Sequence, residues 1–176
     1  METEFEVKIL DIDVDKIRET LGKIGAKKIC IRNMRRYTYD FPDKDPNKWI
    51  RLRDDGEKVM LTIKEIHNEK IDGTKETEIV VNDFEVTHEI MNKLGYEFKN
   101  YQENKRESYL LDGVNIEIDF WPKISPYLEI EGKNAEEVES TVKKLGFSMK
   151  QTSTANTFVI FEKHGIDLLK TKVLKF

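Results

Sequence analysis

The sequence predicts an α+β fold whose strands are charged on one face and apolar on the other. The first eight residues set the pattern, because Glu4, Glu6 and Lys8 alternate with apolar neighbours. Alternate side chains of a β-strand share one face, so these three ions point to the same side. Five further segments repeat the alternation: Arg51/Arg53, Thr62/Lys64, Glu76/Glu78, Glu117/Asp119 and Glu129/Glu131. A sheet that closes on its charged face would enclose a tunnel.

The apolar faces of these strands are equally regular, since Ile50 and Leu52, or Ile116 and Ile118, fill the intervening positions. A slip of one residue would turn the charges toward the core, so the pattern specifies the register. An ordinary half-solvated strand also carries charges on its polar face. Neutral polar residues are nearly absent from the charged faces, however, which favours charges concentrated on one another.

Length and composition favour a single domain that covers residues 1–176. Charged residues make up 36% of the chain, yet the net charge is only −4, which argues against a nucleic-acid partner or a basic membrane-binding surface. Cys30 is the only cysteine, so no intrachain disulfide can form. No apolar run approaches the roughly 18 residues of a membrane span, and no basic and apolar leader is visible. We therefore expect a soluble cytoplasmic protein, either a monomer or a homodimer.

The first elements are a strand over residues 2–10 and a helix capped by Asp13 or Asp15. The helix runs to about residue 23 and stops at Gly22 or Gly25. A long strand follows over residues 26–41. Residues 41–47 form a loop, because two prolines with flanking Asp and Asn residues favour turns.

The middle of the chain reads as hairpins followed by a helix. Strands near 48–54 and 57–66 are joined by Asp55-Gly56, a strong hairpin signal. Two more strands are expected to join them through a turn near Asp72-Gly73. Residues 83–94 have apolar residues at helical spacing and Gly95 as a stop.

The last third alternates strands and helices before an apolar tail. The expected segments are strands at 96–111, 114–121 and 126–132, helices at 134–145 and 153–163, and a tail over 165–176. Asp112-Gly113 turns the first of these strands into the second, and Asn134 caps the first helix. The tail ends in apolar residues that could dock on the barrel.

The residues named so far resemble the CYTH superfamily, the triphosphate tunnel metalloenzymes, which includes class IV adenylyl cyclases, thiamine triphosphatases and inorganic triphosphatases. Glu4-Phe-Glu-Val-Lys8 matches the family's Glu-x-Glu-x-Lys signature. The remaining motifs follow in the family's order over nearly the whole chain: Tyr39-Asp40-Phe41-Pro42, Arg51-Leu-Arg53, Thr62-Ile-Lys64, Glu76-Thr-Glu78, Arg106, Asp119 and Glu129-Ile-Glu131-Gly132.

The resemblance implies a closed eight-stranded antiparallel β-barrel with a charged bore and helices packed outside. The positions proposed to face the bore carry eight carboxylates and five cations, a formal charge of about −3. Like charges crowded in a partly desolvated site are costly unless partnered. Two divalent cations would bring the sum to about +1, and hard oxygen ligands suit Mg²⁺ or Mn²⁺. We therefore expect Mg²⁺ or Mn²⁺ as the cofactor and a triphosphate-containing small molecule as the ligand.

The family also implies roles for individual residues. By similarity, the metal ligands are Glu4, Glu6, Asp119, Glu129 and Glu131. The catalytic candidates are Lys8, Glu78 and Asp119, of which Glu78 and Asp119 would serve a second metal or position water. Arginine forks and lysine ammonium groups bind phosphate oxygens. The expected substrate-binding residues are Lys8, Trp49, Arg51, Arg53, Lys64 and Arg106. Glu76 and Glu117 stay open between a metal role and pairing with a cation in the bore.

The attacking group decides the reaction. Water attacking the terminal phosphorus makes the protein a hydrolase, whereas attack by the ribose 3′-hydroxyl of ATP on the α-phosphorus yields cyclic AMP and pyrophosphate. Trp49 resembles the tryptophan that stacks on the substrate in thiamine triphosphatases, although it could equally hold an adenine or plug the barrel mouth. The His-Phe-x-Arg element of bacterial class IV cyclases is absent. We rank a metal-dependent triphosphatase first, an adenylyl cyclase second and a non-catalytic binder of polyphosphate or nucleotides third.

Three positions depart from the family's pattern. Asn104 stands where the family often has a lysine, Arg36 stands where many members have an acidic residue, and Trp121 stands where some have a lysine. These changes either retune the preferred substrate or only shift charges within the bore.

Overall fold

The strands of this chain close into a barrel. In the computed structural model, which describes residues 2–176, eight antiparallel strands pair in the order β2-β3-β4-β5-β1-β8-β7-β6, and pairing of β6 with β2 completes the ring. The strands are β1 (Glu2–Ile9), β2 (Lys27–Asp40), β3 (Lys48–Asp54), β4 (Val59–Ile66), β5 (Thr74–Val81), β6 (Phe98–Leu111), β7 (Val114–Phe120) and β8 (Tyr127–Gly132). The predicted α+β barrel is confirmed.

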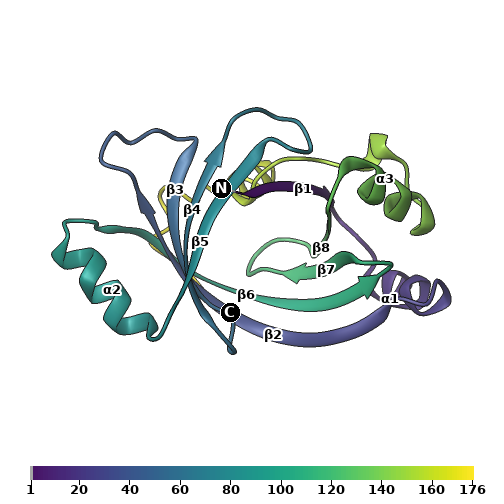
Figure 1. The fold of residues 1–176 in the computed structure, drawn as a ribbon, viewed down its shortest axis with the longest axis horizontal. Helices are drawn as coiled ribbons and strands as arrows, with labels where there is room; N and C mark the ends of the chain where they lie inside the picture. The colour runs from purple at the N-terminus through teal and green to yellow at the C-terminus, as the bar shows by residue number, and fades with distance from the viewer. Residues whose placement is uncertain (1) are drawn as a thin grey trace.

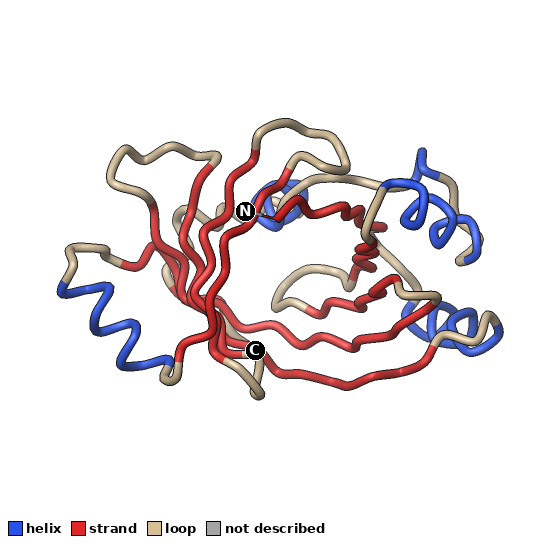
Figure 2. The backbone as a smooth tube through the Cα atoms, viewed as in Figure 1, coloured by secondary structure: helices blue, strands red, loops and turns tan. Residues whose placement is uncertain are grey.

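The two longest strands form the floor of the molecule as drawn. Each of β2 and β6 has 14 residues, and they run side by side along the lower edge of Figure 1. The other six strands of the ring lie above this pair in the same view, as the tube in Figure 2 shows. A short strand, β9 (Val173–Leu174), adds to β6 in parallel. The expected docking of the tail is confirmed, since Leu168 and Leu174 are buried against the barrel.

Four helices pack outside the barrel over the described residues: α1 (Val14–Lys23), α2 (Phe84–Lys93), α3 (Ala135–Lys144) and α4 (Thr157–Lys163). Each begins at an Asp or Asn whose side chain accepts a backbone N–H of the first turn; these caps are Asp13, Asp83, Asn134 and Asn156. A 3-10 turn, η1 (Met149–Gln151), lies between α3 and α4.

The outward faces of the strands supply the hydrophobic core. Helices α1 and α3 cover the apolar face of β1, β7 and β8 at one end of the molecule, where Leu21 and Val142 are fully buried with Ile116 and Leu128. Helix α2 covers β2 and β3 at the other end, where Phe84 joins a second apolar cluster. The charged faces are therefore left to the inside of the barrel, as the alternation predicted.

Two expectations for individual elements are wrong. Only one strand, β5, follows the turn at Asp72-Gly73, because Asp83 then caps helix α2. The last helix begins at Thr157 rather than at residue 153, because the backbone of Ser153 instead bonds to both the N–H and the carbonyl of Lys8 at 2.8 Å. None of the helices among residues 2–176 combines the length and the apolar character needed to cross a membrane.

Candidate active site

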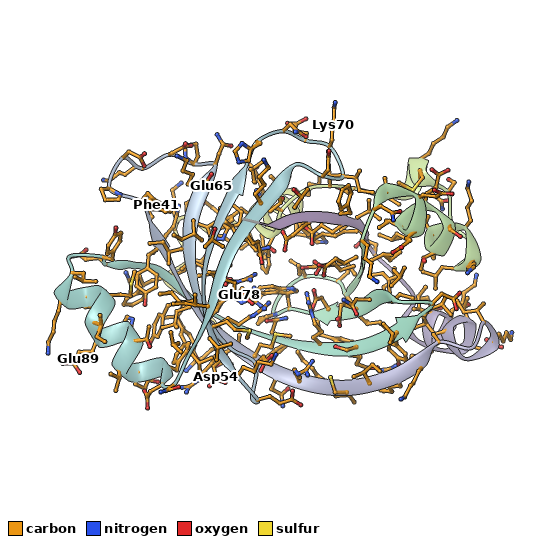
Figure 3. The ribbon with its side chains drawn as sticks, viewed as in Figure 1. Phe41, Asp54, Glu65, Lys70, Glu78 and Glu89 are labelled. Carbon is orange, nitrogen blue, oxygen red and sulfur yellow. The ribbon has the colours of Figure 1, made fainter. Side chains whose placement is uncertain are left out.

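The barrel encloses a cavity of about 790 Å³. Figure 3 shows side-chain nitrogen and oxygen atoms gathered inside the barrel next to Glu78 of β5. The cavity brings together every residue assigned a role by similarity: Glu4, Glu6, Lys8, Trp49, Arg51, Arg53, Lys64, Glu78, Arg106, Asp119, Glu129 and Glu131. Of the two carboxylates left open, Glu76 lines the cavity, and Glu117 accepts a hydrogen bond from Ser108 at 2.6 Å.

One wall of the cavity is dense in carboxylates. Glu6 of β1 stands directly opposite Glu131 of β8 in the strand register, and like charges in that position repel. Burial, and then the neighbouring carboxylates of Glu129, Glu4 and Glu6, raise the pKa of Glu131 to about 7. This wall has more negative charge than its cations neutralise.

Lys8 and Lys64 hold the carboxylates of this wall in place. The Lys8 ammonium lies 2.7 Å from Glu6 and 3.4 Å from Glu129, and these contacts raise its pKa although burial opposes them. Lys64 donates to both oxygens of Glu4 at 3.0 and 3.1 Å and also contacts Glu76. The two lysines therefore act as counter-ions of the carboxylates. Because both also line the cavity, an anion bound beside the carboxylates would lie within their reach.

Arg106 and Asp119 form a bidentate ion pair in the cavity. The Arg106 Nε and Nη2 donate to the two oxygens of Asp119 at 2.8 and 2.6 Å, and Nη2 also donates to Glu129 at 2.9 Å. Asp119 is fully buried and takes a further bond from Asn104 at 3.3 Å. In this arrangement Asp119 fixes the direction of the guanidinium, and it would bind a metal only by exchanging that contact.

The opposite wall is positive. Arg51 and Arg53 of β3 face the cavity. Burial is the main cause that lowers the pKa of Arg51, which also lies 3.3 Å from Glu76 and 3.6 Å from Glu78. The neighbouring Arg51, and then burial, lower the pKa of Arg53 to about 9. A guanidinium keeps its proton in proteins, so the two arginines add two positive charges to this wall and have Glu78 as a shared partner.

The two walls face each other across the barrel. The carboxylate pair lies at the junction of β1 and β8, and the arginines lie at the junction of β2 and β3. In the eight-strand ring these junctions are diametrically opposed. A ligand that carries both a cation and an anion, such as a metal-bound polyphosphate, has charges of the right sign for both walls.

The carboxylate wall has the donor chemistry of a magnesium or manganese site. Over the described part of the chain, no three acidic or imidazole side chains are drawn together into a formed metal centre. The donors are nevertheless of the hard oxygen type that these ions prefer, and the crowded Glu6 and Glu131 would gain a counter-charge on binding one. The residues present therefore fit a divalent metal.

Several residues of the site had no role assigned from the sequence. Thr38, Gln102 and Tyr127 line the cavity and were not named, while Arg36, which also lines it, and Asn104, buried just behind, were noted only as departures from the family's pattern. The alternation on β2 and β6 places all but Tyr127 on the inward face, in phase with Arg106, but most are neutral and so gave no charge signal. Arg36 adds a sixth cation to the five that were counted.

A second cavity, of about 800 Å³, adjoins the first. Trp49, Thr38 and Phe158 line both, so the two spaces meet at the barrel mouth beside helix α4. Apolar side chains of the tail, including Ile166 and Leu168, line its far side. This space can receive the organic part of a ligand whose phosphates lie in the barrel.

Comparisons with known proteins agree with this geometry. The CYTH domain family model matches residues 2–156. A Methanocaldococcus jannaschii protein named "Putative adenylate cyclase" is 28% identical over 132 residues, which cover 73% of this chain and 75% of that protein. The solved structure of the PH1012 protein of Pyrococcus horikoshii is 25% identical, with a TM-score of 0.75 over 87% of this chain and 96% of that one.

A plant protein has the same fold at lower identity. The structure of the Hippeastrum protein HpAC1, described as a putative adenylyl cyclase with a dominant triphosphatase activity, is 16% identical with a TM-score of 0.63. The match covers 97% of this chain and all of that one (100%).

Proposed function

Because the chain belongs to the CYTH domain family, we propose that its barrel hydrolyses a triphosphate, either inorganic tripolyphosphate or an organic triphosphate, with the help of a divalent metal ion. The observation that carries this proposal is the pair of opposed walls, one where the carboxylates of Glu6 and Glu131 face each other and one where Arg36 and Arg53 do so. A phosphate chain with its metal satisfies both at once. Hydrolysis of the terminal phosphoanhydride consumes one water and releases orthophosphate and the shortened phosphate.

The cations of the cavity would bind and orient the phosphate chain. Arg51 and Arg53 present guanidinium forks that match phosphate oxygens. Arg106 can donate from Nη1 while Nε and Nη2 stay on Asp119, and Lys8 and Lys64 supply point charges beside the carboxylate wall. Asp119 holds Arg106 in its direction through two hydrogen bonds. Positioning and charge neutralisation are most of what phosphoryl transfer requires.

Glu78 is suited to orient the attacking water. Its Oε2 accepts a hydrogen bond from Thr62 at 2.6 Å and lies 3.6 Å from Arg51, so that oxygen is engaged. Among the described residues no hydrogen bond is formed to Oε1, and the side chain lines the cavity and is 34% exposed. Oε1 can therefore accept a hydrogen bond from a water molecule.

The metal would be held by Glu4, Glu6, Glu129 and Glu131, with Asp119 as a further ligand if it leaves Arg106. When bound, Mg²⁺ or Mn²⁺ would neutralise charge that develops on the phosphate oxygens.

Adenylyl cyclase activity is the second candidate. The relative from Methanocaldococcus jannaschii bears that name, and the second cavity beside Trp49 offers room for a nucleoside. The Hippeastrum protein, which shares the fold, is itself described both as a putative adenylyl cyclase and as having a dominant triphosphatase activity. The two reactions differ in whether water or the ribose 3′-hydroxyl attacks.

One assay separates the candidates. The purified protein is incubated with tripolyphosphate, ATP or thiamine triphosphate, each with Mg²⁺, Mn²⁺ or EDTA, while phosphate and cyclic AMP are both measured. Phosphate release that EDTA abolishes supports the triphosphatase. Formation of cyclic AMP with equimolar pyrophosphate would instead support the adenylyl cyclase. Tight binding of a triphosphate without either product would support the non-catalytic binder.

A further inference from the structure

Arg36 is a buried arginine that faces the cavity and has no assigned role. It lies on β2, lines the cavity and is only 8% exposed. Burying a guanidinium costs free energy that neighbouring groups must offset. The partners of Arg36 therefore indicate what the side chain is there to bind.

The groups that hold Arg36 are neutral. Its Nη2 donates to the amide oxygen of Asn104, and its guanidinium carbon lies 4.7 Å from the centre of the Trp121 ring. Trp121 is itself fixed, since its Nε1 donates to the Tyr127 hydroxyl at 2.9 Å. These contacts set the direction of the guanidinium, but they supply no negative charge to neutralise it.

The charged neighbours of Arg36 are mostly of its own sign. Arg36 stands directly opposite Arg53 in the register of β2 and β3, where like charges destabilise a sheet. Burial, and then Arg51, Arg53 and Arg106, hold the pKa of Arg36 well below its ordinary value. Asp119 acts in the other direction, but both of its oxygens are already bound to Arg106.

Three guanidinium groups of this wall also have unused donors. The Nε atoms of Arg36, Arg51 and Arg53 are buried and, among the described residues, have no hydrogen-bond partner. The Nε of Arg32 shares this property but lies outside the cavity, on a guanidinium that is paired with Glu57. Buried donors of folded proteins are normally paired. Three unpaired donors that line one cavity, together with an Arg36 that has no carboxylate partner within residues 2–176, indicate a site for an anion with several oxygens.

We propose that Arg36 is a substrate-binding residue that completes a three-arginine phosphate site with Arg51 and Arg53, and that Asn104 and Trp121 position it. This inference rests on the proposed function, because it concerns the same triphosphate. It explains why two of the departures from the family's pattern, Asn104 and Trp121, both contact the third. Arg36 supplies a cation beside the neutral Asn104, and the Trp121 ring lies against its guanidinium.

The charge of the three arginines matches a triphosphate better than a diphosphate. Fully ionised tripolyphosphate carries five negative charges and pyrophosphate four, so one bound Mg²⁺ leaves three and two respectively. Three guanidinium groups neutralise the first complex. Loss of Arg36 should therefore weaken tripolyphosphate binding more than pyrophosphate binding.

The test compares Arg36→Gln with wild-type protein by isothermal titration calorimetry, using tripolyphosphate and pyrophosphate with Mg²⁺, and by thermal unfolding without ligand. We expect tripolyphosphate to bind the variant about 10- to 100-fold more weakly, as for loss of a charged hydrogen bond. The melting temperature of the ligand-free variant should stay the same or rise, because an unneutralised buried charge has been removed. A residue with a merely structural role would lower it.

Arg32→Gln is the matched control. Arg32 lies on the same strand and face, outside the cavity, and is already paired with Glu57 at 2.7 Å. Its replacement should leave tripolyphosphate binding unchanged. If Arg36→Gln does not fold, Arg36→Lys keeps the charge but not the fork, and weaker binding is again expected.

Unchanged tripolyphosphate binding by either Arg36 variant overturns the inference, whatever its effect on melting. Equal weakening by Arg32→Gln overturns it as well, because the effect would then come from net charge alone. If wild-type protein binds no triphosphate at all, the proposed function itself has failed. The two failures are therefore distinguishable.

Discussion

Glu107 offers a quantitative test of the electrostatics on the outside of the barrel. Its carboxylate is 1% exposed and accepts bonds from Arg18 at 2.5 and 3.2 Å, from Lys28 at 3.2 Å and from the Tyr109 hydroxyl at 3.1 Å. The bonds from Arg18, opposed by burial and aided by Lys28, lower the pKa of Glu107 from 4.5 to about 2. A fall of that size on folding contributes about 3 kcal/mol to stability at neutral pH.

The expected cost of Glu107→Gln is smaller than this figure. Arg18 and Lys28 are 39% and 46% exposed, so water screens their charges and can solvate them when the carboxylate is gone. We expect the free energy of unfolding at pH 7 to fall by about 2 kcal/mol. Because the folded-state pKa is the lower one, the stabilisation is complete above pH 4.5 and is lost as the pH falls toward 2.

Urea unfolding followed by far-ultraviolet circular dichroism measures the effect at pH 7 and at pH 3. The difference in the free energy of unfolding between wild type and Glu107→Gln should be about half as large at pH 3 as at pH 7. Glu103→Gln is the control, because Glu103 lies on the same face of β6 and, among residues 2–176, accepts a side-chain hydrogen bond from the Tyr101 hydroxyl alone, at 2.9 Å. A cost for Glu107→Gln that is the same at both pH values would refute the charge argument and point to packing.

The proposed site makes three further predictions. Glu6→Gln should lower metal-dependent turnover at least about 100-fold while the melting temperature changes little, and full activity would remove Glu6 from the metal site. Arg53→Ala should raise the KM for every triphosphate about 10-fold or more, whereas an unchanged KM would place the side chain outside the substrate path. Trp49→Ala should raise the KM for ATP and thiamine triphosphate about 5-fold but leave tripolyphosphate unaffected; equal losses on all three would assign Trp49 a structural role.

Much of the barrel could be predicted because the strand period is a local property. Alternation alone assigned Glu4, Glu6 and Lys8 to one face, and the structure places all three in the cavity. Turn signals such as Asp55-Gly56 also act over a few residues, and β3 and β4 meet there. The start of α4 was missed because it depends on a distant contact, the backbone bonds between Ser153 and Lys8.

The site was harder to predict because charge balance depends on pairing between strands. The alternation in the sequence shows that Arg106 and Arg36 both face inward. It does not show which residue of the neighbouring strand lies opposite each of them. In the structure Asp119 of β7 lies opposite Arg106, and Arg53 of β3 lies opposite Arg36. Register across the barrel therefore decides which arginine is neutralised and which is left for a ligand. The sequence did not show what Asn104 does, because its contacts are with two residues of other strands. It accepts a hydrogen bond from Arg36 and donates one to Asp119.

The placement of like charges argues that this interior serves binding rather than stability. Opposed pairs such as Glu6 with Glu131 and Arg36 with Arg53 each cost free energy, and exchanging one partner between the walls would have given two ion pairs. Under the proposed function, a metal would relieve the first pair and a phosphate chain would relieve the second. Because the metal would also bind the phosphate, each ligand would lower the cost of binding the other, and linkage requires the two effects to be equal. In this proposal the separation of charge across the barrel couples the metal to its substrate.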